Sequence, residues 1–499
     1  MLEFGLFCQS LRSLYVQVNP CDAEKWERVR IRVSGTGISE PPQTGHKFMS
    51  DMMTKMITMI RQTARYVAAM LLFVTLPIAA CAGMIRDTEL EAGLQRLMAP
   101  LVEAAGYPPN SIAVRVIIDP NYNAFVAGEQ IIYVHSGLLL NAKSAEEIIG
   151  VMAHEIGHLK AGHVPRRDAA IADANSANAL AALAAIAVAA GGGGDAAAGV
   201  LIGGQDQVTR KLLQTIRYDE AVADEIGLSL LDKSGISASG LRDMMQRMAA
   251  QRALPESRQS RYYQTHPDAA ERLSIYQDHV SRQTGQTTPI SDEILALVDR
   301  LETKMRAYVE PPQSVLAQFD DAGVLAHLYA KSIALYRRGE LEAAMTVIDN
   351  LIEMAPKDAF FHEFRGDVLL SMAKPDAAAK AYERAISIRP DSPQILLNYG
   401  RALIASGKAT DLNDAISALE QARDGEPKWT FAYRQLAIAY GRAGQLADAD
   451  ITLADEALMT GDTQQAIKMA KRSLSHGSVR DEIKNRANDI LYRYGALKE

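Results

Sequence analysis

The segment SAEEIIGVMAHEIGHLK, residues 144–160, decides the fold of the first half of the chain. Ser144 followed three residues later by Glu147 is a capping box, the pattern with which many helices begin. Ile148 and Met152 then recur at the spacing of one helical face, so that face should be buried. We therefore expect a helix that begins at Ser144 and packs against a hydrophobic core.

The same helix contains the pattern His-Glu-x-x-His. His154 and His158 are four residues apart, so their imidazoles project from one face and can hold one metal ion. Glu155 lies beside them, where it can take a proton from an attacking water molecule. The alternative is a surface helix with two histidines by chance. The pattern favours the metal site, because this spacing is the one that metal-dependent hydrolases require.

A catalytic zinc site needs a third protein ligand and leaves its fourth position to water. All three cysteines lie at or before Cys81, so a site in the body of the protein must use histidines and carboxylates. Glu220 is the best candidate for the metal, and Asp224, one helical turn later, is placed to hydrogen-bond a histidine ligand. The alternative for this segment is an ordinary acidic helix face.

These motifs together resemble the periplasmic zinc metallopeptidases of the HtpX/CAAX-prenyl-protease clan, most closely the BepA-like members that end in a TPR domain. The resemblance covers most of residues 90–280. It rests on Asn123-Ala124-Phe125, on His154-Glu155-Ile156-Gly157-His158 with His163, on Glu220 with Ala223-Asp224, and on Thr265-His266-Pro267 with Arg272. It implies an α+β gluzincin-type metalloprotease domain that binds one Zn²⁺ per chain through His154, His158 and Glu220.

The resemblance also implies roles that spacing alone does not suggest. His266 and Arg272 should stand near the metal and help to hold the substrate or the developing oxyanion. Residues 130–135, a predicted strand, could pair with an extended substrate. His163 lies five residues beyond His158 and so off the shared helical face, which argues against a ligand role.

Two segments rich in β-branched and aromatic residues, 111–118 and 130–135, are expected to be strands. Residues 169–204, between the two metal motifs, are rich in alanine and glycine. A membrane hairpin is conceivable there, but Gly191–Gly194 interrupts the apolar run before it is long enough to span a bilayer. We expect a mobile apolar flap near the cleft.

The N-terminus has the pattern of an export signal. Residues 1–48 show no periodicity and are expected to be a disordered extension or a mis-assigned start. Residues 49–82 contain basic positions followed by the apolar stretch YVAAMLLFVTLPIAA, as in a signal peptide. Cleavage could follow an A-x-A pattern at residues 80–82, or Cys81 could be the lipidated first residue of a lipoprotein; an uncleaved anchor helix is the third alternative. We expect a periplasmic protein, with Cys81 as its membrane anchor if it is lipidated.

The C-terminal half is repetitive. Ala344, Ala378, Ala415 and Ala449 recur at nearly constant intervals, with glycines in turns and prolines that close successive units. A helix-turn-helix repeat of about 34 residues with small residues at these places is typical of TPR repeats. We expect an all-α TPR solenoid whose groove binds a peptide or protein partner; the alternative is a stabilising tail.

The composition fits this organisation and excludes several classes. The chain has 499 residues, 48% hydrophobic residues and a formal net charge of −7, which excludes a disordered chain and a polytopic membrane protein and argues against nucleic-acid binding. We expect a metalloprotease domain at 83–285, a helical linker at 286–325 and the TPR repeats at 326–499. The expected function is a zinc endopeptidase of the bacterial cell envelope that degrades misfolded or misassembled proteins. The alternative is a TPR adaptor or chaperone with a silent protease domain.

Overall fold

The computed structural model describes residues 83–128, 130–163, 217–250, 266, 269–283, 287–319, 323–477 and 479–495, and all of them belong to one compact unit, Cys81–Glu499. The expected signal peptide, the lipidation site and the alanine- and glycine-rich segment lie outside the described residues. Within the described part of the chain, no helix is both long and apolar enough to cross a bilayer.

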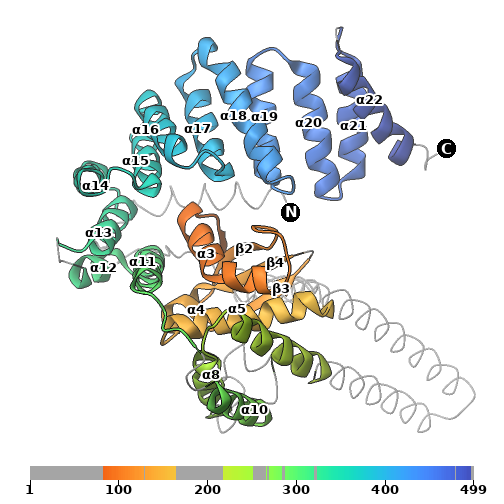
Figure 1. Cartoon of the computed structure of the whole chain (residues 1–499). Coiled ribbons are helices and arrows are strands. Elements are labelled where there is room, and N and C mark those ends of the chain that lie inside the picture. Colours follow the sequence, from red (N-terminus) through yellow and green to blue (C-terminus); the bar gives the residue numbers. More distant parts are fainter. Residues whose placement is uncertain are drawn as a thin grey trace, which may run out of the picture. The chain divides into compact units, whose positions relative to one another are not determined.

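The protease half is built on a small mixed sheet (Figure 1). Its strands are β1 (Gly83–Ile85), β2 (Ala113–Ile118), β3 (Ala124–Ala127) and β4 (Ile131–His135), in the spatial order β1-β2-β4-β3. β2 and β4 are parallel, whereas the outer strands β1 and β3 are antiparallel to their neighbours. The fold class expected from the sequence, an α+β domain followed by helical repeats, is confirmed.

The sheet corrects one expectation. The strands expected at 111–118 and 130–135 are present as β2 and β4. However, β4 is hydrogen-bonded on both sides, by β2 and by β3, so an extended substrate cannot pair with it. Among the described residues the edges of the sheet are β1 and β3, which the sequence did not predict as strands.

Helices cover the face of the sheet that presents Val114, Val116, Ile132 and Val134, and these side chains join one hydrophobic core with α3 and α5. The helices of this half are α3 (Thr88–Ala104), α4 (Ser136–Asn141), α5 (Ala145–Lys160), residues 217–233, α8 (Ser239–Ala250), α10 (Ala269–Arg282) and α11 (Asp292–Val309).

α5 begins as expected, but only half of the capping box forms. Ser144 accepts a hydrogen bond from the backbone N–H of Glu147 at 3.3 Å. The Glu147 carboxylate does not return to Ser144; it accepts from Tyr122 Oη at 2.6 Å and from the Lys143 backbone N–H, and it pairs with Arg247. The Glu147 side chain, which the local pattern assigned to the cap, therefore makes tertiary contacts instead.

Two glycines let the helix at 217–233 approach α5 closely. A Cβ added at Gly157 would lie 2.4 Å from the carbonyl oxygen of Ala223, and one added at Gly227 would lie 3.2 Å from that of Ala153. A side chain at Gly157 would therefore push the two helices apart. This close approach brings the acidic residues of the second helix to the histidines of the first.

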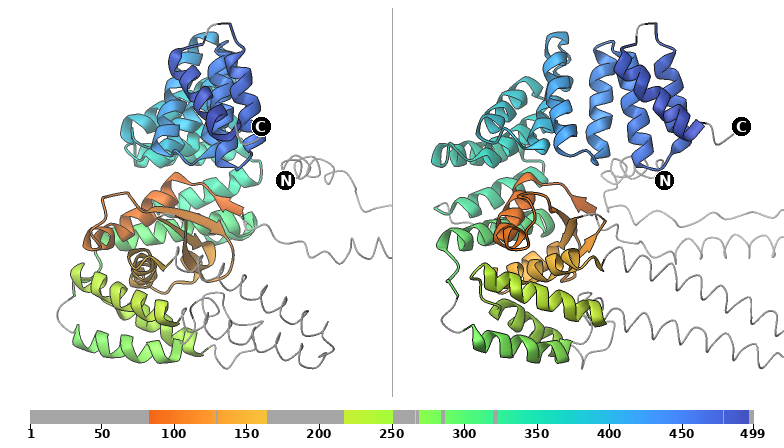
Figure 2. Two further views of the ribbon diagram at one scale, coloured as in Figure 1. Left: turned by 90° about the vertical axis from the view of Figure 1, so that its right-hand side faces the viewer. Right: turned by 45° about the vertical axis from the view of Figure 1, so that its right-hand side comes forward.

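The second half is a series of paired helices, stacked in chain order (Figure 2). They are α13 (Leu325–Arg337), α14 (Leu341–Met354), α15 (Ala359–Ser371), α16 (Pro375–Ile388), α17 (Pro393–Ser406), α18 (Leu412–Gly425), α19 (Thr430–Arg442), α20 (Leu446–Met459), α21 (Thr463–Leu474) and α22 (Asp481–Ile490). The periodic alanines are buried in the second helix of each pair. A short 3₁₀ helix, η3 (Ala409–Asp411), lies between α17 and α18.

The expected linker contributes to both cores. α11 places Leu301 and Met305 in the core of the first half, while Ala307 belongs to the core of the first repeat together with Val315 of α12 (Pro312–Gln318). α11 thus joins the two halves through packing and not only through chain connection.

Ion pairs join the start of α3 to α11, and hydrogen bonds join it to the repeats. Lys304 Nζ lies 2.8 Å from Asp87 and 2.9 Å from Glu89. Burial alone would lower the pKa of Lys304, but these two carboxylates outweigh it and hold the pKa well above its usual range. Thr88 Oγ1 lies 2.5 Å from Glu363 of α15 and 2.8 Å from Gln394 of α17. The first helices of two repeats therefore contact the protease half directly.

Candidate metal centre

α5 positions the first three residues of the site. His154, Glu155 and His158 are buried, with at most 3% of any of them exposed. The Nε2 atoms of His154 and His158 face each other at 3.1 Å. The i, i+4 spacing has therefore brought the two imidazoles to a common point, as the sequence predicted.

The helix at 217–233 brings two carboxylates to these histidines. Glu220 Oε2 lies 3.3 Å from His154 Nε2, and Glu220 Oε1 lies 3.4 Å from His158 Nε2. Asp224 Oδ1 lies 2.8 Å from Nδ1 of His154, the nitrogen on the other side of the ring. Glu220 thus lies beside the two Nε2 atoms, whereas Asp224 contacts Nδ1 of His154, on the opposite side of that ring.

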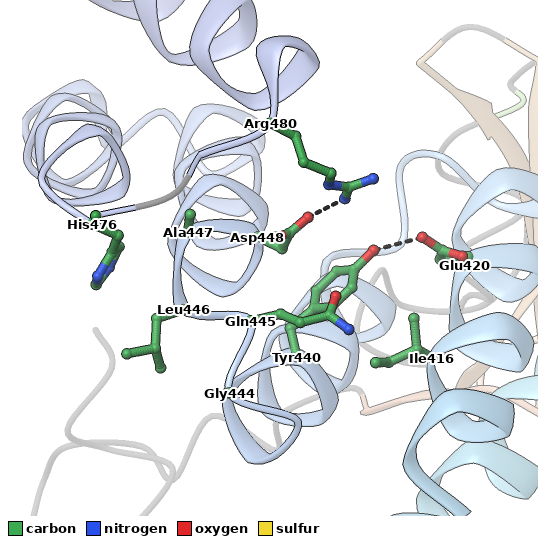
Figure 3. Close-up of a pocket in the computed structure, with 11 residues that line it drawn as sticks. Ile416, Glu420, Tyr440, Gly444, Gln445, Leu446, Ala447, Asp448, His476 and Arg480 are labelled. Atoms are coloured by element: carbon green, nitrogen blue, oxygen red, sulfur yellow. Dashed lines mark hydrogen bonds and ion pairs between the residues drawn. The ribbon is translucent and has the colours of Figure 1, made fainter.

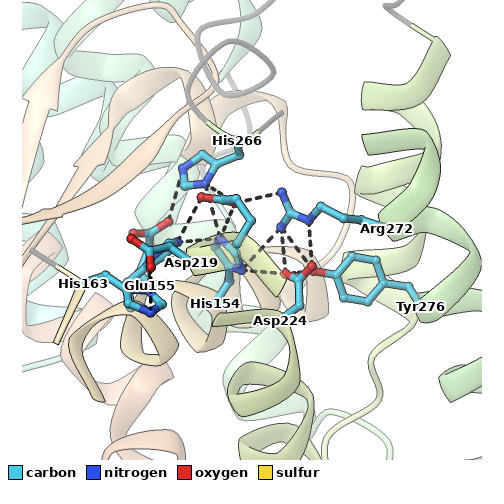
Figure 4. Close-up of polar contacts among 10 residues, drawn as sticks. His154, Glu155, His163, Asp219, Asp224, His266, Arg272 and Tyr276 are labelled. Carbon is cyan, nitrogen blue, oxygen red and sulfur yellow. Dashed lines mark hydrogen bonds and ion pairs between the residues drawn. The ribbon is translucent and has the colours of Figure 1, made fainter. Parts of the chain in front are cut away.

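His266 completes a group of four. Its Nδ1 lies 2.8 Å from Glu220 Oε2 and 3.3 Å from His154 Nε2. One ligand atom from each of His154, His158, Glu220 and His266 can be chosen so that all four lie within 4.8 Å of one another. Figure 4 shows His266 placed across the site from α5.

These distances fit a zinc ion. Ligand atoms about 2 Å from zinc at tetrahedral angles are about 3.3 Å apart, and the separations between His154, His158 and Glu220 are 3.1 to 3.4 Å. Glu220 Oε1 is buried and accepts no hydrogen bond within the described part of the chain. A buried carboxylate oxygen without a donor is costly unless a cation compensates it. Nitrogen and carboxylate donors are also ligands that zinc accepts.

The ionisable groups of the site shift one another's pKa strongly. Burial would lower the pKa of His154, but hydrogen bonds to Asp224 and Glu220 raise it to about 9. Burial lowers the pKa of His158 to about 3, although Glu220 opposes this. Burial would raise the pKa of Glu220, yet the charge of His266 and the polar contacts with the other two histidines hold it well below its usual range. The carboxylate is thus ionised, which is the form that binds a metal.

Arg272 of α10 ties the two carboxylates together. Its Nε and Nη2 donate to the two oxygens of Asp224, each at 2.7 Å, and its Nη1 donates to Glu220 Oε2 at 2.9 Å. Tyr276 Oη, fully buried one helical turn later, donates to Asp224 Oδ1. The structure therefore places Arg272 near the site, as the resemblance implied, but with its guanidinium bonded to the carboxylates of the protein.

His163 and Asp219 form a second set of polar contacts, next to His158. His163 is not in the group of four, in agreement with its position off the shared face of the helix. Its Nδ1 nevertheless lies 2.9 Å from Nδ1 of His158, and its Nε2 lies 3.5 Å from Oδ1 of Asp219. No sequence pattern indicated this contact. Only the i, i+4 spacing from Arg272 could have pointed to Tyr276.

A His-Glu-x-x-His helix beside a small sheet, with a glutamate from a later helix, defines a metallopeptidase. Residues 87–279 match the model of peptidase family M48, and residues 369–411 match a tetratricopeptide repeat model. The chain is therefore a metallopeptidase with a family M48 domain, followed by tetratricopeptide repeats.

Curated proteases are similar to this chain. The chain is 25% identical over 386 residues to the putative beta-barrel assembly-enhancing protease of Vibrio cholerae, a match that covers 73% of this chain and 75% of the relative. It is 23% identical over 399 residues to the beta-barrel assembly-enhancing protease of Yersinia pestis, covering 78% and 80%. The metalloprotease LoiP of Escherichia coli is 32% identical over 183 residues, which are 35% of this chain and 64% of LoiP.

Proposed function

We propose that this protein is a zinc-dependent endopeptidase of the bacterial cell envelope that degrades misfolded or misassembled envelope proteins. The observation that carries the chemistry is the convergence of His154, His158 and Glu220 on one point. Glu155 lies at the same site, with its Oε1 3.7 Å from His266 Nε2. The substrate class is supported by the names of the relatives, which describe proteases that enhance β-barrel assembly.

The division of roles follows from the contacts. His154, His158 and Glu220 would hold one zinc ion, which when bound would polarise the scissile carbonyl and activate water. Glu155 would accept the proton of the attacking water and pass it to the leaving amine. Asp224 holds Nδ1 of His154 and so keeps the lone pair on Nε2. Arg272 positions Asp224 and Glu220.

His266 has two candidate roles. It could stabilise the substrate or the oxyanion, as the resemblance implies. Alternatively, it is a fourth ligand, because its Nδ1 lies within 3.3 Å of both His154 Nε2 and Glu220 Oε2. A catalytic zinc site keeps one position open for water. We favour the second role, with His266 giving way when a substrate binds.

We further propose that an extended substrate pairs with β3. This strand is an edge of the sheet, and it packs against α5, the helix with His154 and Glu155. Strand addition to an exposed edge supplies main-chain hydrogen bonds that do not depend on sequence. That property suits an enzyme whose substrates are recognised by their unfolded state.

The repeats would bind a client or partner protein. Part of their inner surface already contacts the chain itself, through Thr88 with Glu363 and Gln394. A separate hollow of about 740 Å³ lies farther along the repeats, and Figure 3 shows Tyr440 bonded to Glu420 and Arg480 paired with Asp448 in its wall. A peptide segment with polar side chains suits such a wall.

Export to the periplasm remains part of the proposal, with Cys81 as a candidate lipid anchor. Replacing Cys81 by Ser should release the protein from membranes or block its processing if the cysteine is lipidated. A mature protein that begins at Gly83 would instead support cleavage at the A-x-A pattern, and cell fractionation with N-terminal sequencing distinguishes the two.

The decisive experiment on the enzyme is Glu155→Gln. This change should leave zinc bound, because Glu155 is not in the group of four ligands, and should reduce turnover about 100- to 10,000-fold. Zinc content and cleavage of an unfolded casein are measured on the same samples. Glu146→Gln, the same change in the first turn of α5, is the matched control. Equal cleavage by the Glu155 variant with zinc bound would refute the mechanism. If wild type also cleaves nothing and both proteins protect clients from aggregation, the adaptor function is the correct one.

A further inference from the structure

His163 and Asp219 form a buried pair directly behind a proposed metal ligand. Each is only 1% exposed. His163 Nδ1 lies 2.9 Å from His158 Nδ1, the ring nitrogen opposite the one that faces Glu220 and His154. Asp219 Oδ1 lies 3.5 Å from His163 Nε2. Figure 4 shows His163 and Asp219 beside Glu155, on the other side of the site from Arg272.

The contact between the two histidines has only one proton arrangement that suits metal binding. His158 must be neutral with its lone pair on Nε2, so its proton sits on Nδ1. That N–H can donate to His163 only if Nδ1 of His163 carries a lone pair. The neutral ring of His163 must then carry its proton on Nε2, the nitrogen that faces the Asp219 carboxylate. In this arrangement the His158 proton has an acceptor and the His163 proton faces a carboxylate 3.5 Å away, and no other neutral arrangement achieves both.

The two histidine ligands would thus be held in different ways. His154 has a carboxylate directly on Nδ1, since Asp224 lies 2.8 Å away. His158 reaches its carboxylate through a second imidazole. A ligand histidine usually donates its other N–H to an acceptor that fixes the tautomer and the ring orientation. Asp219 is one residue before Glu220. A single helical segment therefore supplies both a proposed ligand and the carboxylate that His158 reaches through His163.

The pair also fixes the chain on either side of residues 164–216, which lie outside the described residues. His163 is the last described residue before that segment, and Asp219 is the third after it. Their contact therefore links a residue that precedes this segment with one that follows it.

We propose that His163, oriented by Asp219, is a positioning residue that keeps His158 in the metal-binding tautomer. The inference rests on the proposed zinc site but not on the proposed substrate. His163→Ala should lower zinc affinity about 10- to 100-fold, the usual cost of losing such a partner. His163→Asn should restore most of the affinity, because the amide oxygen takes the place of Nδ1 as acceptor.

Asp219 supplies a second and independent variant. Asp219→Ala should weaken zinc binding in the wild-type background, because the proton of His163 is then free to move to Nδ1. In the His163→Ala background the same change should have little further effect, because no imidazole remains for Asp219 to orient. A double-mutant cycle measures this coupling between the two residues. His279→Ala, which removes the more exposed histidine paired with Asp232 at 3.0 Å, is the matched control.

The measurements are zinc affinity by competition with a chromophoric chelator, the visible spectrum of the cobalt-substituted protein, and the thermal midpoint of the metal-free protein. A changed cobalt spectrum with an unchanged metal-free midpoint supports positioning. Zinc affinity for His163→Ala equal to that of wild type, or a loss that His163→Asn does not restore, would overturn the inference. Wild-type protein that binds zinc tightly but cleaves no protein would refute the proposed function and leave the inference standing.

Discussion

Arg272 and Asp224 form a two-pronged ion pair, with Nε bonded to Oδ2 and Nη2 to Oδ1, both at 2.7 Å. Both side chains are buried. Burial would raise the pKa of Asp224, but the charge of Arg272 and the bonds from His154 hold it well below its usual range. Asp224 is therefore ionised, although its burial alone would favour the neutral acid. In this form it supports the proposed metal ligand His154.

Replacing Arg272 by Lys tests this support. Lysine keeps the charge but has no planar fork, so it cannot bond both oxygens of Asp224 and reach Glu220 as well. We expect weaker zinc binding by about 10-fold or more and a matching loss of activity at limiting zinc. Chelator competition and casein cleavage over a zinc titration measure this. Arg282→Lys, an exposed arginine at the end of α10, is the control. A loss of activity that persists at saturating zinc would instead indicate direct contact of Arg272 with the substrate.

Replacing Glu220 by Gln tests the third ligand. A neutral amide is a poorer zinc ligand than a carboxylate, so the variant should retain much less zinc after dialysis. Activity should fall with zinc content and recover in part when excess zinc is added. Glu225→Gln, on the exposed side of the same helix, is the control. Undiminished zinc in the Glu220 variant would remove this residue from the site.

The local parts of this site were predictable from sequence, and the parts that depend on tertiary contacts were not. The positions of His154, Glu155 and His158 follow from helical periodicity, and Glu220 with Asp224 follows in the same way once a helix is assumed. The fork of Arg272 joins residues 48 and 52 positions apart. No spacing rule predicts a contact of that kind.

The fold shows the same limit. The capping box at Ser144 predicted the start of α5, but Glu147 was taken up by Tyr122 and Arg247, which no local pattern could indicate. β1 and β3 have three and four residues, too few for an alternating pattern to stand out. Without them, β4 seemed to be an edge strand. The repeats were predicted well because their contacts are between neighbours in sequence.

Replacing His266 by Ala separates its two candidate roles. If His266 is a fourth ligand that must give way, its removal should weaken zinc binding modestly and leave cleavage of unfolded casein equal to or faster than that of wild type. The reason is that the position it fills becomes open to water. If His266 instead stabilises the oxyanion, turnover should fall about 100- to 1,000-fold with zinc still bound. Initial rates at saturating zinc decide, and His279→Ala is the control for loss of a histidine elsewhere.

The junction between the protease half and the repeats should depend on pH through Glu363. Thr88 Oγ1 lies within hydrogen-bond distance of both Glu363 Oε1 and Gln394 Oε1, and a hydroxyl has only one proton to donate. A protonated Glu363 resolves this, because it can donate to Thr88, which then donates to Gln394. Burial and the nearby charge of Asp367 raise the pKa of Glu363 to about 8.

The sign of the effect follows from proton binding. An unfolded glutamate has a pKa near ~4.3, so between about pH 4.3 and 8 the folded protein holds a proton that the unfolded chain has lost. The free energy of unfolding should therefore fall as pH rises through this window, by at most ~1.4 kcal/mol per pH unit from this group. Glu363→Gln should remove this component, because the amide is neutral at every pH and its NH₂ can donate to Thr88. Urea unfolding of both proteins at several pH values measures the difference, with Glu353→Gln, an exposed glutamate of α14, as control. Parallel curves for wild type and Glu363→Gln from pH 5 to 8 would show that Glu363 is ionised in the folded protein and that the junction does not hold its proton.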